Sequence, residues 1–200
     1  MKLWMFTLLL TVFPATASSD IITLGYDNDT FGYGYNPLSA GEAVAVRFTP
    51  EQAVVNIVGI RARIRAYSAA CGENQFWILD DDGPEGSPGT TLYGPDRMTA
   101  PISWGWVQLD FEKSQVTTVE GEFYVAYIKT GTEGICADLG HSLGPGNGRY
   151  WEYKDKTWTW MGSSSPYQYN LRVLVEAEPV PTEKISWSRL KNRTVLRTLN

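Results

Sequence analysis

Apolar and polar residues alternate with a period of two along most of this chain. In the segment at 42–48, Val44, Val46 and Phe48 share one face. The segment at 59–67, GIRARIRAY, places aliphatic residues on one face and arginines on the other. Successive side chains of a strand point to opposite faces, so this alternation predicts half-buried strands. Further strands are predicted at 22–26, 75–80, 106–111, 115–119, 122–129, 149–154, 157–161 and 169–176.

Clusters of Gly, Pro, Asp, Asn and Ser separate these segments, as turns between strands do. The clusters are at 80–89, 93–97, 143–148 and 162–166. No helical period of more than about three turns appears between them. Strands that follow one another without intervening helices predict an all-β fold, specifically an antiparallel two-sheet β-sandwich that is jelly-roll-like. The composition, 43% apolar and 13% aromatic, excludes a disordered, collagen-like or coiled-coil chain.

The two ends of the chain differ from this body. Residues 1–17 combine Lys2, an apolar run at 3–13 and small residues at Ala15 and Ala17, which predicts a signal peptide cleaved before Ser18. An uncleaved anchor is the alternative, but the run is short against the roughly 20 residues that span a bilayer. The predicted organisation is therefore a signal peptide, a β-sandwich domain at 18–178 and a basic linker or tail at 179–200, in a chain that is secreted or otherwise extracytoplasmic.

Charge is unevenly divided between the body and the tail. Residues 18–178 carry 11 Lys and Arg against 21 Asp and Glu, a net charge of −10, whereas residues 179–200 carry a net charge of +4. Phosphate recognition needs clustered Lys and Arg, so the acidic body argues against nucleic acid as a partner. The basic tail has an imperfect amphipathic pattern, which leaves open a disordered segment or a segment that docks on a partner.

Cysteine and acidic residues suggest two structural features. Cys71 and Cys136 are the two cysteines of a chain that we expect to be exported, and an even count in an oxidising compartment predicts a disulfide. Asp80, Asp81 and Asp82 form an acidic turn whose oxygens are of the type that binds Ca²⁺, although the spacing differs from an EF-hand loop. A solvated hairpin is the alternative. The segment at 27–29, Asp-Asn-Asp, is a second weak candidate for Ca²⁺, and no other cofactor is expected.

Catalytic motifs are not found in the sequence. The chain lacks the serine-hydrolase, zinc-protease and P-loop signatures, and its one histidine, His141, has no evident nucleophile as partner. Any chain with this many carboxylates will bring some pair to the distance that glycosidases use, so carboxylates alone do not indicate a hydrolase. We therefore expect a protein that is not an enzyme.

The high content of aromatic residues is the feature of the composition that says most about function. Flat exposed rings flanked by Asp, Asn and Gln bind sugars by stacking on their apolar C–H faces, whereas buried rings fill the space between two sheets. Alternation sends Trp151 and Tyr153 to one face and Tyr150 to the other, so some rings are expected in the core and others in solvent. Trp104 and Tyr150 are expected to be the more exposed. The candidate ligand-binding residues are Trp104, Trp106, Tyr150, Trp151, Tyr153, Trp158 and Trp160.

The order of the segments adds a resemblance. AVAVRFTPE, FWILDDDGPEGSPGTTLYGP, WGWVQLDF, GEFYVAYI, RYWEYKDKTWTWM and YNLRVLVEAE follow one another between about residues 40 and 177. This succession resembles the β-sandwich module of many uncharacterised secreted and cell-surface bacterial proteins. The resemblance implies an extracellular jelly-roll-like domain for binding or architecture, and it carries no ligand residues or catalytic signature.

The sequence therefore predicts a secreted, non-catalytic β-sandwich that binds an extracellular carbohydrate or a surface protein, without a transmembrane segment in the mature chain. Two alternatives stay open. One is a structural or assembly module that docks through its basic tail, and the other is a hydrolase that acts on polysaccharide.

Overall fold

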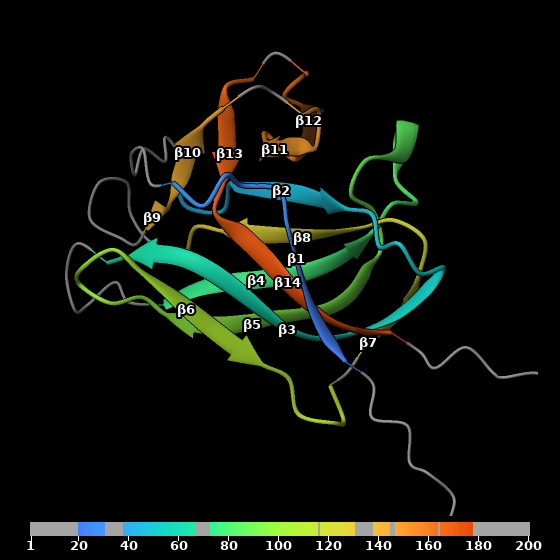
Figure 1. Ribbon diagram of the computed structural model, residues 1–200. Coiled ribbons are helices and arrows are strands. Elements are labelled where there is room, and N and C mark those ends of the chain that lie inside the picture. Colours follow the sequence, from blue (N-terminus) through green and yellow to red (C-terminus); the bar gives the residue numbers. More distant parts are fainter. Residues whose placement is uncertain are drawn as a thin grey trace, which may run out of the picture. The chain divides into compact units, whose positions relative to one another are not determined.

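The computed structural model describes residues 20–30, 38–66, 73–115, 117–130, 138–144, 147–163 and 165–177, of which nearly all lie in strands or in the turns between them (Figure 1). Residues Asp20–Glu178 form one compact unit. The predicted signal peptide at 1–17, the tail at 179–200 and both cysteines, Cys71 and Cys136, lie outside the described residues. Within the described part of the chain, no helix has the length and apolarity needed to cross a membrane.

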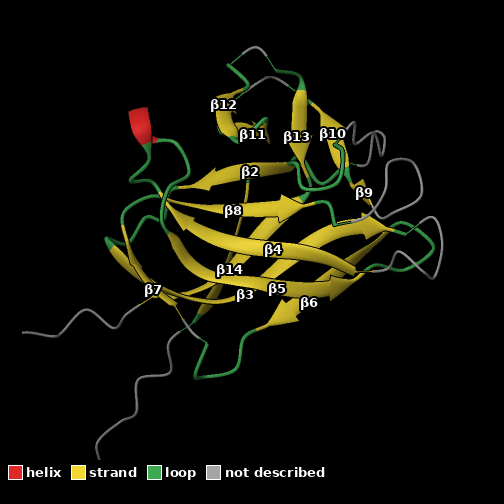
Figure 2. Cartoon of the chain, turned by 180° about the vertical axis from the view of Figure 1, so that it is seen from behind, coloured by secondary structure: helices red, strands yellow, loops and turns green. Residues whose placement is uncertain are grey.

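Two six-stranded antiparallel sheets face each other, and a two-stranded sheet lies beside them (Figures 1 and 2). The first sheet, sheet A, contains β1 (Ile21–Gly25), β3 (Val54–Arg65), β6 (Gly105–Asp110), β7 (Thr117–Glu120), β9 (Asp138–Leu139) and β14 (Leu171–Ala177). The second, sheet C, contains β2 (Ala43–Phe48), β4 (Glu73–Asp80), β5 (Thr91–Thr99), β8 (Phe123–Ile128), β11 (Tyr150–Lys154) and β12 (Thr157–Trp160). The small sheet pairs β10 (His141–Leu143) with β13 (Tyr167–Tyr169).

The strand order is that of a jelly roll with an added hairpin. The path through sheet A is β1-β14-β3-β6, and the path through sheet C is β12-β11-β2-β8-β4-β5. Without the β11–β12 hairpin, the path through each sheet has four strands, and the chain crosses between the sheets repeatedly, as two Greek keys require. The predicted all-β, two-sheet, jelly-roll-like fold is confirmed.

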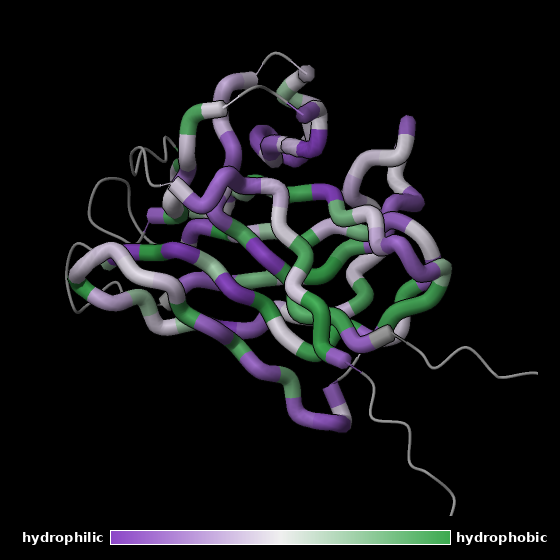
Figure 3. The backbone as a smooth tube through the Cα atoms, viewed as in Figure 1, coloured by the Kyte–Doolittle hydropathy of each residue, from purple (hydrophilic) through white to green (hydrophobic). Residues whose placement is uncertain are grey.

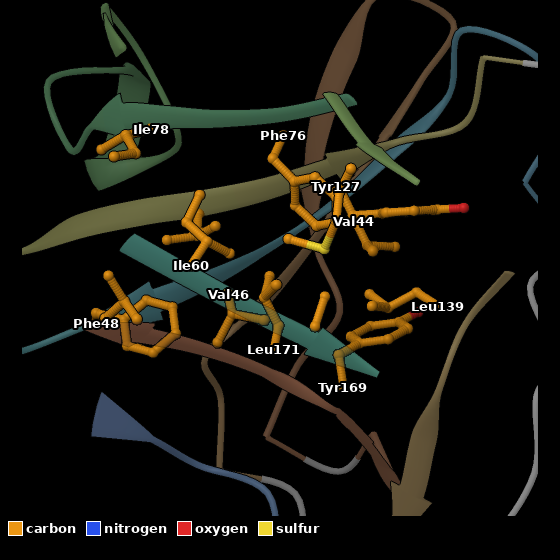
Figure 4. Close-up of a cluster of buried hydrophobic side chains, with 14 of the residues drawn as sticks. Val44, Val46, Phe48, Ile60, Phe76, Ile78, Tyr127, Leu139, Tyr169 and Leu171 are labelled. Carbon is orange, nitrogen blue, oxygen red and sulfur yellow. The ribbon is translucent and has the colours of Figure 1, made fainter. Parts of the chain in front are cut away.

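The core lies between the two sheets and is built by the alternation seen in the sequence. Ile60, Ala62 and Ile64 of β3 face inward and are fully buried, as predicted, while the arginines between them face outward. Figure 4 shows side chains of both sheets meeting in this space, among them Ile60 of sheet A and Phe76 of sheet C. Figure 3 shows the corresponding alternation of hydrophobic and hydrophilic residues along the central strands.

One predicted turn is instead part of a strand. The segment at 93–97, YGPDR, was expected to be a turn, but β5 continues through it. Pro95 lacks an N–H for a ladder hydrogen bond, and such residues are accommodated at edge strands and bulges. Here β5 is the edge strand of sheet C, and the pairing of β4 with β5 shifts register between Phe76 and Ile78. Gly94 adopts a φ of +103° there, a conformation that glycine allows at little cost.

Candidate functional site

The β11–β12 hairpin places four aromatic rings on the outer face of sheet C. Its loop consists of Asp155 and Lys156, whose φ values of 50° and 63° produce the twist that a two-residue hairpin needs. Trp151 pairs with Trp160, and Tyr153 pairs with Trp158. Opposite residues of an antiparallel pair share a face, so all four rings lie on the same side, as alternation predicted for Trp151 with Tyr153 and for Trp158 with Trp160.

Small side chains in the next two strands leave space beside these rings. Trp151 is opposite Ala45 of β2, and Ala45 is opposite Ala126 of β8. Ala126 is in turn opposite Trp77 of β4. A row across the sheet therefore has large aromatic residues at its two ends and alanines between them. The strands β11 and β4 that carry these rings are three interstrand spacings apart, roughly 14 Å.

The result is a groove of about 220 Å³ on the outer face of sheet C. Trp77 forms one wall of the groove, and Tyr153 and Trp158 together form the other. The ring centroids of Tyr153 and Trp158 are 5.1 Å apart. The floor is made by Ala43, Ala126 and neighbouring apolar residues. All three aromatic side chains of the walls are half-buried, so each still exposes surface to a ligand. The side chain of Ala126 is fully buried beneath them.

The loop at 81–90, which carries the turn η2 (Pro84–Gly86), stands at one end of the groove. Figures 1 and 2 show this loop and the β11–β12 hairpin rising on the same side of sheet C. The Tyr124 hydroxyl donates a hydrogen bond to the Gly86 carbonyl and so ties the loop to the sheet. Burial raises the pKa of Tyr124 to about 12, which keeps this hydroxyl protonated and able to donate at neutral pH.

Hydrogen bonds to a carboxylate of the acidic turn stabilise this loop. Thr90 donates its backbone N–H and its hydroxyl to the two carboxylate oxygens of Asp82, at 2.6 and 2.7 Å. Gly89 lines the groove, and a Cβ atom at this position would lie 1.9 Å from the Asp82 carboxylate. A side chain at position 89 would therefore disrupt the hydrogen bonds between Thr90 and Asp82.

The described residues show no cluster of metal ligands at the proposed calcium sites. No group of three or more His, Cys, Asp or Glu side chains gathers within the described ranges, so Asp80, Asp81 and Asp82 do not converge on one point. Both oxygens of Asp82 accept hydrogen bonds from Thr90, and one oxygen of Asp80 accepts the Asp81 N–H. This turn fits the alternative prediction, a hairpin. Its carboxylates accept hydrogen bonds from neighbouring residues of the same loop.

The second acidic segment, at 27–29, binds an arginine instead of a metal. Arg172 donates two hydrogen bonds to Asp27, at 2.9 and 2.7 Å, and one to Asp29, at 2.7 Å. Burial acts to raise the pKa of Asp27, but the hydrogen bonds from Arg172 and from the Asp29 amide and the charge of Arg172 outweigh it, so the pKa lies below its usual value. This cluster fixes the segment after β1 to β14.

Asp27→Asn should lower the free energy of unfolding at neutral pH by about 2 kcal/mol, because it weakens two charge-assisted hydrogen bonds. A carboxyl whose pKa falls on folding stabilises the folded state only while it is ionised. The difference between wild type and variant should therefore be full above pH 3.8, the unperturbed value, and decline as the pH falls below it. Urea unfolding from pH 7 to pH 2.5 measures this; a difference that does not change with pH would contradict the assignment.

Two of the predicted ligand residues lie on the opposite sheet. Trp106 is on the outer face of sheet A, where the guanidinium carbons of Arg172 and Arg61 lie 4.5 and 5.5 Å from its ring. Trp104 is half-buried just before the same strand, β6. Neither residue lines the groove, because β6 belongs to sheet A and the groove lies on sheet C.

The expected exposure of Tyr150 is wrong. Its side chain is 1% exposed and faces the core between the sheets, 5.5 Å from the ring of Tyr169. Trp151 is 9% exposed and packs edge-on against Tyr124 beneath the groove's walls. Trp160 is 51% exposed, but it donates its indole N–H to the Gly148 carbonyl and does not line the groove.

Trp77 is the wall residue that sequence reasoning missed. The alternation in QFWILD already separated Phe76 and Ile78 from Trp77 and Leu79, but it did not say which pair faces outward. Phe76 and Ile78 are fully buried in the core, which leaves Trp77 on the outer face. The Trp77 indole N–H is covered and has no hydrogen-bond partner among the described residues.

His141 lies elsewhere and is not placed for proton transfer in the groove. Its side chain is buried at the start of β10, where the ring packs edge-on against Tyr167 at 4.9 Å. Burial lowers the pKa of His141, which favours the neutral imidazole.

No protein-family model matches this chain, and neither does any curated protein sequence.

Proposed function

We propose that this protein is a secreted, non-catalytic β-sandwich that binds extracellular carbohydrate in the groove on the outer face of sheet C. The observation that carries the proposal is the aromatic lining of this groove, Trp77 on one side and Tyr153 with Trp158 on the other, above an apolar floor that includes Ala43 and Ala126. Sugars present apolar C–H faces that stack on such rings.

The size of the groove favours a single sugar ring over a larger ligand. Sites for drug-sized molecules have volumes of about 300–1,000 Å³. The groove, at about 220 Å³, is smaller than this range. Thr91 adds a hydroxyl to the lining, and Gln75 lies on the same face, opposite Ile128. A few polar groups beside apolar walls suit a ligand that has both hydroxyls and apolar faces.

The lining also supports a binding role over a hydrolytic one. Glycosidases use two carboxyl groups that flank the bond to be broken. None of the described residues that line the groove is Asp or Glu. A hydrolase that uses this groove would therefore need its carboxylates from elsewhere.

Export is part of the same proposal. It rests on the pattern of residues 1–17 and on the resemblance to modules of secreted and cell-surface bacterial proteins. An oxidising compartment would also permit the proposed disulfide between Cys71 and Cys136.

A glycan-binding screen of the purified protein tests this function. We expect retention on one class of polysaccharide in affinity electrophoresis, and we expect retention to be unchanged by EDTA, because the acidic turns do not form a metal site. Trp106→Ala serves as a matched control, since it removes an indole of the opposite sheet. Absence of retention on every plant, microbial and animal glycan tested would contradict the proposal and favour the assembly module that docks through its basic tail.

A further inference from the structure

The two ends of the groove differ, and the difference bears on how a glycan chain enters it. Asp80 is opposite Phe123, and Phe123 is opposite Phe48, so the loop at 81–90 begins where β2 ends. In Figure 1 this loop stands at the end toward which the β2 arrow points. Gly41, at the other end, donates its N–H to the Lys129 carbonyl just after β8.

The end at the loop is closed. Tyr124 is fully buried, and its hydroxyl holds the Gly86 carbonyl over the sheet. Leu79 is 4% exposed, and together with Gly89 it lines the groove beneath and beside the loop. The loop is held further by backbone hydrogen bonds, from the Asp80 N–H to the Thr90 carbonyl at 2.8 Å and from the Gly89 N–H to the Asp80 carbonyl at 2.9 Å. A glycan chain cannot continue past this point along the sheet.

The end at Gly41 is open. This glycine is exposed, and a Cβ atom added to it would meet nothing within 4 Å. Ile128, which lines the groove next to it, is half-buried. The space therefore extends to solvent on this side, beside the wall that Tyr153 and Trp158 form.

We infer that the groove recognises the terminal residue of a glycan chain, with the rest of the chain leaving past Gly41. This inference rests on the proposed carbohydrate function and narrows it. A groove with one closed end and a volume of about 220 Å³ accepts one ring and presents the next residue to solvent. An internal residue has a neighbour on both sides, and one of the two would collide with the loop at 81–90.

The test is a series of oligosaccharides from one to six units, prepared for cello-, xylo-, manno- and galacto-linked chains and measured by isothermal titration calorimetry. We expect the Kd to change by less than about twofold from one unit to six in the series that binds, because added residues lie outside the groove. An affinity that rises tenfold or more with length would overturn terminal recognition but leave the carbohydrate function intact, whereas no binding in any series would overturn both.

A pair of glycine variants tests the direction of exit. Gly41 and Gly121 have φ values of +86° and +79°, and both have open space around them. Asparagine tolerates such backbone conformations. Gly41→Asn should weaken the binding of the hexasaccharide at least about threefold more than that of the monosaccharide, while Gly121→Asn should change neither. Equal effects of Gly41→Asn on both ligands, or no effect on either, would overturn exit past Gly41.

Discussion

Trp77→Ala is expected to weaken glycan binding by about 30-fold or more, which corresponds to a loss of at least about 2 kcal/mol. Truncating the indole removes one complete wall of the groove, since Tyr153 of β11 is three strands away across the sheet and Trp158 of β12 is four strands away. Trp158→Ala should have a similar effect, because its ring forms the opposite wall with Tyr153. Isothermal titration calorimetry with the retained glycan measures both.

Three comparisons separate a loss of binding from a loss of stability. Trp106→Ala removes a half-buried indole of sheet A and should leave the affinity unchanged. Trp77→Phe should recover part of the affinity, because it restores a ring and the indole N–H has no acceptor among the described residues. Thermal melting of each variant establishes that the protein is folded. If Trp77→Ala were folded and bound as wild type does, the groove would not be the binding site.

The second large effect concerns stability and a buried ion pair at one end of the sandwich. Lys129 and Asp138 have side chains that are 2% and 8% exposed, with 3.2 Å between Nζ and Oδ1. Asp138→Asn should lower the free energy of unfolding by about 3–5 kcal/mol, because it leaves the Lys129 ammonium buried without its counter-charge. Guanidinium unfolding at pH 7 gives the value.

The double variant Lys129→Met with Asp138→Leu provides the control. It removes both charges together and fills their space with apolar atoms, so it should cost less than Asp138→Asn alone. A double variant that is the more destabilised of the two would mean that the ion pair itself, and not the avoidance of a lone buried charge, stabilises this end of the sandwich. An Asp138→Asn variant within about 1 kcal/mol of wild type would show that Lys129 has another acceptor or reaches water.

Much of the fold could be predicted from local pattern. The inward faces of β2 and β3 follow from a period of two, because Val44 with Val46, and Ile60 with Ala62, share a face only in extended backbone. The β11–β12 hairpin and the shared face of its aromatic residues follow in the same way. The continuous strand through Pro95 could not be predicted in this way, since its place at a sheet edge depends on strand order and not on neighbouring residues.

The candidate site was predictable only in part, and the reason is the distance along the chain between its walls. The aromatic residues of the hairpin were candidates from composition and spacing, but Tyr150 faces the core and Trp106 lies on the other sheet. The residue types of the acidic turn suit Ca²⁺, which led to the prediction of a metal site. In the structure, the carboxylate oxygens of Asp82 accept hydrogen bonds from Thr90 of the same loop.

The sequence by itself determined that the chain alternates, that it folds into two antiparallel sheets and that each hairpin presents certain residues together, because these properties depend on the side-chain period and on turn residues close in sequence. Only the tertiary structure decided which outward-facing residues meet. Trp77 lies across the groove from Tyr153 and Trp158 because β2 and β8 separate β4 from the β11–β12 hairpin. That order is set by pairing between strands far apart in the chain, and burial of the common core selects it over the alternatives.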